Sequence, residues 1–231
     1  MTKWRVVGPL ALLVFALACS NAEAGTVVLT FEGLQNLEPI DNFYNGGLGG
    51  LGSGPGPNDG ITFTPDSLAI ISADAGGTGN FSGNPSGVTI AFFLALGSSD
   101  TMDVAAGFDT GFSFFYSGAV DGSVNVYSGL DGTGTLLTSL VLPANFQNRP
   151  CAAGAAGPFC TWDPVGVTFS GIAESAVFSG SANEIGFDDI TLGSATAGGG
   201  SVPEPGSLSL LALGLAGVGA LRRKNLAALL A

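Results

Sequence analysis

Short segments rich in β-branched and aromatic residues recur along most of the chain. Turn dipeptides separate several of them, among these Asp59-Gly60, Asp121-Gly122 and Asp131-Gly132. The pattern predicts nine strands, at residues 26–31, 61–64, 88–94, 111–116, 123–127, 135–142, 165–169, 175–178 and 184–192. No segment of comparable length has the period of an amphipathic helix. The predicted fold is all-β, an antiparallel β-sandwich of jelly-roll or lectin-like type.

The clearest part of this pattern is residues 108–142, which read as a meander of three strands. Within it, alternation predicts that Val124 and Val126 share one face of a strand, while Asn125 and Tyr127 share the other.

The N-terminal segment departs from the strand pattern. Lys3 and Arg5 precede an uncharged, mostly apolar run at residues 6–18, and the run ends close to an Ala22-Glu23-Ala24 site. This order is typical of a secretory signal peptide over residues 1–24, cleaved after Ala24. One alternative is a lipoprotein signal, in which Cys19 would become a lipidated N-terminus; another is a buried N-terminal helix.

The C-terminal segment has the features of a second membrane signal. Pro203-Glu204-Pro205 is followed by 16 uncharged residues at 206–221 and then by the basic cluster Arg222-Arg223-Lys224. Sixteen residues make a minimal membrane span, since about 20 cross a bilayer comfortably. Basic residues stay on the cytoplasmic side, so both ends place the intervening region outside the membrane.

A Pro-Glu-Pro motif, an apolar helix and an arginine-rich stop resemble the sorting signal of PEP-CTERM proteins of Gram-negative bacteria. The resemblance implies recognition by exosortase, a membrane cysteine protease-like transpeptidase, and processing at or near Pro203-Glu204-Pro205. It also implies an exported surface or matrix protein associated with exopolysaccharide and biofilm. The chain departs from the family in the seven mostly apolar residues, 225–231, that follow the basic cluster.

These features divide the 231 residues into a signal peptide (1–24), a β-sandwich domain (25–193), a Gly/Ser/Ala linker (194–202) and a sorting signal with a transmembrane helix (203–231). The formal net charge of the chain is −12, but the region between the two signals contains sixteen acidic residues and a single base, Arg149. Its charge of about −15 argues against binding nucleic acid. The chain also has no histidine, which excludes Ser-His-Asp and Cys-His catalysis and His-ligated zinc.

Two cysteines remain after the signal peptide. Cys151 and Cys160 form an even pair in an oxidising compartment and predict one disulfide. Close to this loop, Trp162 is a candidate for stacking on a sugar ring, as are Phe43 and Tyr44. The alternative is that Trp162 packs over the end of the sandwich and that the other two rings anchor the long glycine-rich loop at residues 33–60.

Carboxylates are the remaining source of chemistry. Glu32 ends the first predicted strand and Asp188-Asp189 lie in the last, so the three could gather around a structural Ca²⁺, the alternative being solvated acids. Catalysis on a glycosidic bond would need two converging carboxylates, and the glutamates of the exported region are Glu32, Glu38, Glu174 and Glu184. Nothing in their spacing marks two of them as an acid and nucleophile pair.

The sequence therefore predicts a non-enzymatic protein with no catalytic residues, exported by the secretion machinery. The precursor would be held transiently in the inner membrane, and exosortase would then deliver it to the cell surface or extracellular matrix, where it associates with polysaccharide. The alternatives are a secreted carbohydrate-active enzyme and a structural matrix protein without a ligand.

Overall fold

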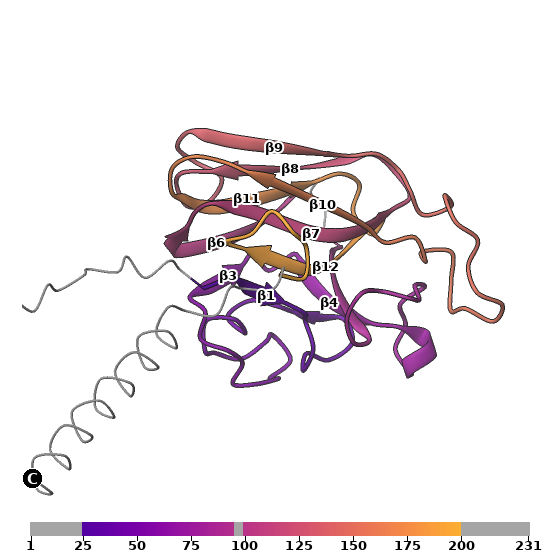
Figure 1. Cartoon of the computed structure of the whole chain (residues 1–231). Coiled ribbons are helices and arrows are strands. Elements are labelled where there is room, and N and C mark those ends of the chain that lie inside the picture. The colour runs from indigo at the N-terminus through magenta and orange to yellow at the C-terminus, as the bar shows by residue number, and fades with distance from the viewer. Residues whose placement is uncertain (1–24, 95–98, 200–231) are drawn as a thin grey trace, which may run out of the picture.

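The protein folds into two antiparallel β-sheets that pack face to face, seen in a computed structural model that describes residues 25–94 and 99–199 (Figure 1). The larger sheet contains seven strands, β1 (Val27–Leu29), β2 (Glu38–Pro39), β4 (Ser67–Ile71), β5 (Thr89–Phe93), β7 (Gly111–Gly118), β10 (Asp163–Thr168) and β12 (Ile185–Leu192). The smaller sheet contains five, β3 (Ile61–Phe63), β6 (Ser99–Phe108), β8 (Gly122–Tyr127), β9 (Leu136–Leu142) and β11 (Ala173–Ser179). The described residues form one helical element, a 3-10 turn over Ala73–Ala75 (η1). The predicted all-β sandwich is confirmed.

The order of strands is β10-β7-β12-β5-β4-β2 in the larger sheet, with β1 beside β12, and β3-β6-β11-β8-β9 in the smaller one. Strands that follow one another in sequence repeatedly change sheets, as they do in jelly-roll sandwiches. The first and last strands pair, with Val27 opposite Leu192 and Leu29 opposite Ile190. Both ends of the described domain therefore meet at the same sheet.

Phenylalanine side chains fill the space between the two sheets. The ring of Phe114 on β7 lies 6.0 Å from that of Phe178 on β11 and 5.6 Å from that of Phe187 on β12, measured between centroids. Phe178 and Phe187 are 4.9 Å apart, and all three rings are buried. Burial of each ring stabilises the fold by roughly 1.5–3 kcal/mol, and edge-on contacts add about 0.5–1.5 kcal/mol for each pair.

Each of the nine predicted segments contains a strand, but the sequence pattern does not predict β2, β4 or β6. The largest omission is β6, whose ten residues lie between β3 and β11 in the smaller sheet. Its first three buried positions are Asp100, Met102 and Val104. Because an aspartate occupies a core position and alanines and a glycine follow, the segment has the composition of a loop.

Asp100 is accommodated in the core by a set of hydrogen bonds. Its carboxylate accepts from the hydroxyl groups of Thr64 and Ser67 and from the Thr101 amide, the last at 2.7 Å. Burial raises the pKa of Asp100 to about 6, although these bonds act in the opposite direction. Since Ser67 lies on β4 and Asp100 on β6, the carboxylate links the two sheets.

The predicted meander over residues 108–142 is only partly correct. β8 and β9 form an antiparallel hairpin in the smaller sheet. Val124 and Val126 are fully buried, whereas Asn125 and Tyr127 are half-buried on the other face, as predicted. β7 instead belongs to the larger sheet, so the short turn between β7 and β8 carries the chain from one sheet to the other.

After β12 the chain continues along the larger sheet, where the sequence predicts a linker. The hydroxyl of Ser113 donates to the Ser194 carbonyl at 2.9 Å, and the Gly198 amide donates to the Thr191 hydroxyl at 3.0 Å. We call residues 194–199 the C-terminal latch. The described residues of the predicted linker, 194–199, are therefore fastened to the sheet.

Candidate functional site

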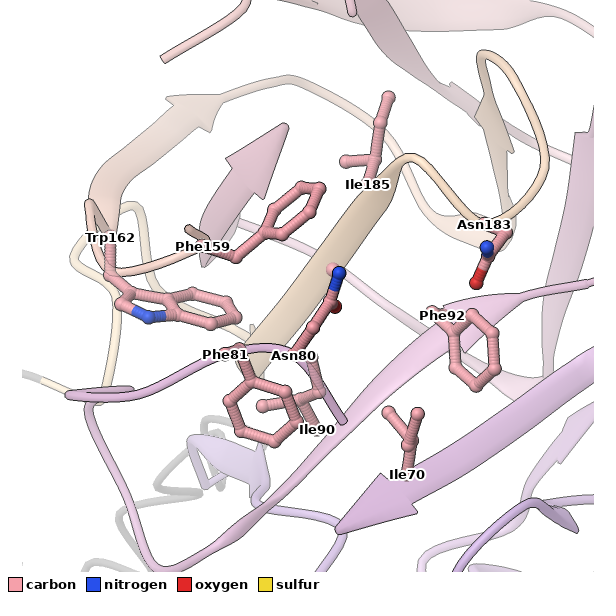
Figure 2. Close-up of a pocket in the computed structure, with 10 residues that line it drawn as sticks. Ile70, Asn80, Phe81, Ile90, Phe92, Phe159, Trp162, Asn183 and Ile185 are labelled. Atoms are coloured by element: carbon pink, nitrogen blue, oxygen red, sulfur yellow. The ribbon is translucent and has the colours of Figure 1, made fainter. Parts of the chain in front are cut away.

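A shallow hollow lies on the face of the larger sheet that points away from the sandwich core (Figure 2). Ten residues line it, and four of them are aromatic. The ten are Ile70, Asn80, Phe81, Ile90, Phe92, Phe159, Trp162, Asn183, Ile185 and Gly186. Successive strand residues face opposite ways, so on β5 Ala91 and Phe93 enter the main core while Ile90 joins a separate cluster with Phe81 and Trp162. The sheet therefore supplies a rigid apolar floor.

A glycine on β12 makes room for the tryptophan above this floor. A Cβ atom at Gly186 would lie 2.7 Å from Cδ1 of Ile90 and 3.3 Å from Cη2 of Trp162. The first distance is shorter than side chains tolerate, and the second is tight. A larger residue at Gly186 would force the end of the Ile90 side chain to move and would press against the indole.

Two loops hold the aromatic side chains in place over the strands. The indole Nε1 of Trp162 donates to the Ser82 carbonyl at 3.2 Å, and its ring meets that of Phe81 edge-on with centroids 6.0 Å apart. Phe81 and Phe159 form an isolated parallel bridge between the two loops. These contacts join chain segments that lie about 80 residues apart in the sequence.

The predicted disulfide between Cys151 and Cys160 is present, with Cα atoms 5.5 Å apart. It closes part of the long connection between β9 and β10, which extends from the sandwich beside η1 (Figure 1). There the Ala156 amide donates to Oδ2 of Asp74 at 3.2 Å. The disulfide and this hydrogen bond together restrain the loop that carries Phe159.

The hollow is too small to enclose a sugar. Its volume is about 30 Å³, roughly the share of one water molecule in the liquid. A ring could lie across its mouth, where Phe159 is half-buried and the amide side chains of Asn80 and Asn183 are exposed. Figure 2 shows Trp162 and Phe159 on one side of this opening and Phe92 with Asn183 on the other. An apolar floor with amides at the rim can bind a flat, polar-edged ligand by stacking and hydrogen bonds.

Of the three residues predicted to stack on sugar, the structure places only Trp162 at this hollow. It is 7% exposed and forms part of the wall. Phe43 and Tyr44 lie in the main core, with ring centroids 5.2 Å apart and exposures of 5% and 4%. A stacking role for these two is therefore wrong; they anchor the glycine-rich loop, the alternative that the sequence left open.

That loop, residues 33–60, is also organised by a fully buried carboxylate. Glu38 Oε1 accepts from the amides of Leu51 and Ser53, both at 2.9 Å. Oε2 accepts from the Gln35 amide at 2.6 Å and from the Ser53 hydroxyl at 2.5 Å. Burial alone would raise the pKa of Glu38, but the four hydrogen bonds outweigh it and hold the pKa below its ordinary value.

The carboxylates considered for calcium serve first to hold a loop. Asp188 is completely buried; its oxygens accept from the Asn84 side chain and from the amide and hydroxyl of Ser86, all at 3.1 Å. Burial raises the pKa of Asp188 to about 7, against the effect of these bonds. Glu32 Oε1 accepts from the Val88 amide in the same loop at 2.8 Å. Glu32 and Asp188 thus fasten the loop between η1 and β5 to the terminal strands.

Asp189 differs from its neighbour. Its φ of 49° lies in the left-handed region, its side chain is 8% exposed, and Oδ1 has no hydrogen-bond partner among the described residues. Within residues 25–94 and 99–199, no group of three or more His, Cys, Asp or Glu side chains is arranged to hold a metal ion. Calcium binding by Glu32, Asp188 and Asp189 stays a prediction.

Sequence reasoning missed Phe81, Phe92 and Phe159, which form most of the aromatic lining. They come from three separate segments, and only their packing reveals a shared site. The signal peptide with Cys19, the Pro-Glu-Pro motif and the basic cluster at residues 222–224 lie outside the described residues. Among the residues that are described, no helix is long and apolar enough to cross a bilayer.

Comparison with solved structures gives distant similarities. One is a glycoside hydrolase family 43 arabinoxylan arabinofuranohydrolase from Bacillus subtilis, solved with cellotetraose: 18% identity over 57% of this chain and 26% of that chain, with a TM-score of 0.37. The carbohydrate-binding module CsCBM6-3 of Clostridium stercorarium, solved with cellobiose, gives 18% identity over 56% of this chain and 83% of that one, with a TM-score of 0.34. A mutant of the family 29 carbohydrate-binding module CBM29-2 gives 10% identity over 79% of this chain and 99% of that one, with a TM-score of 0.39.

No curated protein matches the sequence. A family model described as the PEP-CTERM protein-sorting motif matches residues 201–224, which include Pro203-Glu204-Pro205 and end at Lys224. The match covers the motif, the apolar run and the basic cluster that the sequence pattern singled out. The chain is therefore a protein that carries the PEP-CTERM sorting motif.

Proposed function

We propose that this chain is a non-enzymatic protein of the cell surface or extracellular matrix that binds exopolysaccharide. The secretion machinery exports it, the apolar run at 206–221 holds the precursor transiently in the inner membrane, and exosortase processes it at or near Pro203-Glu204-Pro205. The sorting motif supports the export part of this proposal. The folded domain supports the binding part.

The observation that carries the binding proposal is the aromatic hollow on an outer sheet face. Phe81, Phe92 and Trp162 form its buried floor and wall, and the half-buried ring of Phe159 together with the exposed residues Asn80 and Asn183 lies at its mouth. Here the sheet, Gly186 and the indole hydrogen bond fix the rings before any ligand arrives. A preorganised site avoids the entropy cost of ordering side chains on binding.

Two features favour binding over catalysis. No residue that lines the hollow is acidic, so the site itself offers no carboxylate pair for cleaving a glycosidic bond. Of the four glutamates considered for catalysis, Glu38 is buried and both its oxygens are bound by its own loop. A carboxylate held in this way cannot approach a substrate.

Binding is tested by retention of the exported chain on insoluble polysaccharides, including the polymer of the producing cells. Asn80→Ala and Asn183→Gly remove exposed amide side chains at the rim, glycine being compatible with the left-handed φ of 62° at position 183, and each should weaken retention several-fold. Phe159→Ala should abolish it, whereas Phe169→Ala, a half-buried phenylalanine outside the hollow, is the matched control. Equal loss in the two phenylalanine variants would contradict the assignment of the site.

The same experiment separates the alternatives. Shortening of the polymer that stops on replacing one of the four glutamates would establish an enzyme. No retention on any polysaccharide would leave a structural matrix protein without a ligand.

Sorting is tested by fractionating cells and measuring the mass and both termini of the protein in each fraction. We expect a surface or matrix form that lacks both residues 1–24 and the segment after the Pro-Glu-Pro motif. An intact chain confined to the inner membrane would refute the sorting proposal.

A further inference from the structure

Two larger hollows are lined in part by the loop that follows Phe81. Their volumes are about 390 and 200 Å³, and both are lined by Asp74, Ser82 and Gly83. Ser82 is also the residue whose carbonyl accepts the hydrogen bond from the Trp162 indole. Phe81 lines the aromatic hollow and the next residue, Ser82, lines the other two, so adjoining residues of one loop line all three hollows.

Asp74 is the only charged residue among those that line these three hollows. It belongs to η1, is exposed, and accepts one hydrogen bond, from the Ala156 amide to Oδ2. Oδ1 is therefore available to a donor from outside the protein. Asp74 lines both of the larger hollows, whose other lining residues are uncharged.

The overall negative charge of the domain also favours a cationic ligand. Arg149 is the only base in the part of the chain that the structure describes, and it pairs with Asp163 at 2.5 Å. Sixteen acidic residues share the same domain. A glycan carrying uronate or sulfate groups would be repelled, whereas one carrying ammonium groups would be attracted and oriented.

We propose that the glycan bound here is a linear polymer of amino sugars with free amines. One ring lies across the aromatic hollow, and Asp74 receives the ammonium group of a neighbouring ring. This inference rests on the proposed polysaccharide-binding function and specifies its ligand by charge.

The test uses two probes with the same backbone, a β-1,4-linked glucosamine hexamer and its fully N-acetylated counterpart. Binding of the exported chain is measured by calorimetry at about pH 6, where amines are protonated. We expect the amine hexamer to bind more tightly, and the difference to shrink at about 1 M salt, where charges are screened within roughly 3 Å.

Asp74→Asn should lower affinity for the amine hexamer about two- to fivefold, the range measured for exposed ion pairs, and leave the acetylated hexamer unaffected. The matched control is Asp121→Asn, because Asp121 is likewise exposed and accepts one backbone amide, from Ala144. An equal loss in both variants would overturn the role of Asp74, since it would reflect only net charge.

Equal binding of the two hexamers, or tighter binding of the acetylated one, would overturn the amino-sugar proposal and leave polysaccharide binding in place. The amino-sugar proposal would likewise be overturned, and polysaccharide binding would stand, if neither hexamer binds but the chain is retained on the polymer of the producing cells. Absence of binding to every polysaccharide would instead refute the proposed function itself.

Discussion

Replacing Glu38 with glutamine should destabilise the protein strongly, although the side chain keeps its size. The carboxylate is fully buried and accepts four hydrogen bonds, two at each oxygen. Glutamine retains one oxygen and places an amide group against two donors. Loss of two bonds to a charged acceptor, each contributing about 1.5–3 kcal/mol, predicts a decrease of roughly 3–6 kcal/mol in the free energy of unfolding.

A change of this size is measurable by calorimetry or urea denaturation. For a domain of 150–250 residues, roughly 3–6 kcal/mol corresponds to a decrease in melting temperature of roughly 6–24 °C. The control is Glu174→Gln, which removes the charge of a half-buried glutamate on β11 and should change stability by less than about 0.5 kcal/mol. Proteolysis near Leu48 and Leu51, which are 52% and 58% exposed, should also accelerate in the Glu38 variant.

Equal melting temperatures for the two variants, with the loop equally resistant to protease, would refute the reasoning. The glycine-rich loop would then be held by its backbone hydrogen bonds and by Phe43 and Tyr44 alone.

Three further perturbations test other parts of the domain. The pKa values of Asp100 and Asp188 are raised by folding to about 6 and about 7. The native state therefore binds more protons than the unfolded chain between about pH 4 and 7. The free energy of unfolding should fall as pH rises through this window, by roughly 3 kcal/mol for Asp100 and roughly 4 kcal/mol for Asp188, and Asp188→Asn should flatten a plot of melting temperature against pH. If calcium binds at Glu32, Asp188 and Asp189, EDTA should lower the melting temperature and added Ca²⁺ restore it; no shift in either direction would remove these residues from consideration. Replacing both Cys151 and Cys160 with serine should lower the free energy of unfolding by about 2–3 kcal/mol. The double variant should also weaken polysaccharide retention more than Asn58→Ala, a substitution in an exposed loop outside the hollow.

The sequence predicts the sandwich well where strands follow the rule of alternation. On β8, Val124 and Val126 face the core and their polar neighbours do not, and the burial of the strand agrees. The rule fails on β6 because its inward-facing aspartate accepts hydrogen bonds from hydroxyl groups on residues some 35 positions away. A pattern read from neighbouring residues does not include hydrogen-bond partners so far away in the sequence.

The candidate site is less accessible to sequence reasoning than the fold. Trp162 stands out as the only tryptophan in residues 25–202, but its partners Phe81 and Phe92 look like any other strand or loop aromatics. Asn-Phe-Tyr-Asn at residues 42–45 looks exposed because of its polar flanks, yet its two rings are buried. Which aromatic rings lie in the core and which line the hollow is decided by how the strands pair and pack, which the local sequence does not show.

The C-terminal latch connects the fold to the sorting signal. A Cβ atom at Gly166 of β10 would lie only 2.0 Å from the Ala195 carbonyl oxygen, so the latch fits against the sheet because this position is glycine. Three residues, 200–202, separate Gly199 from Pro203, so the two lie at most ~14 Å apart along the chain. A protease that acts at the motif must therefore work beside the folded domain. Because residues 194–199 precede Pro203 in the chain, cleavage at or next to Pro203 would leave the C-terminal latch in the processed domain.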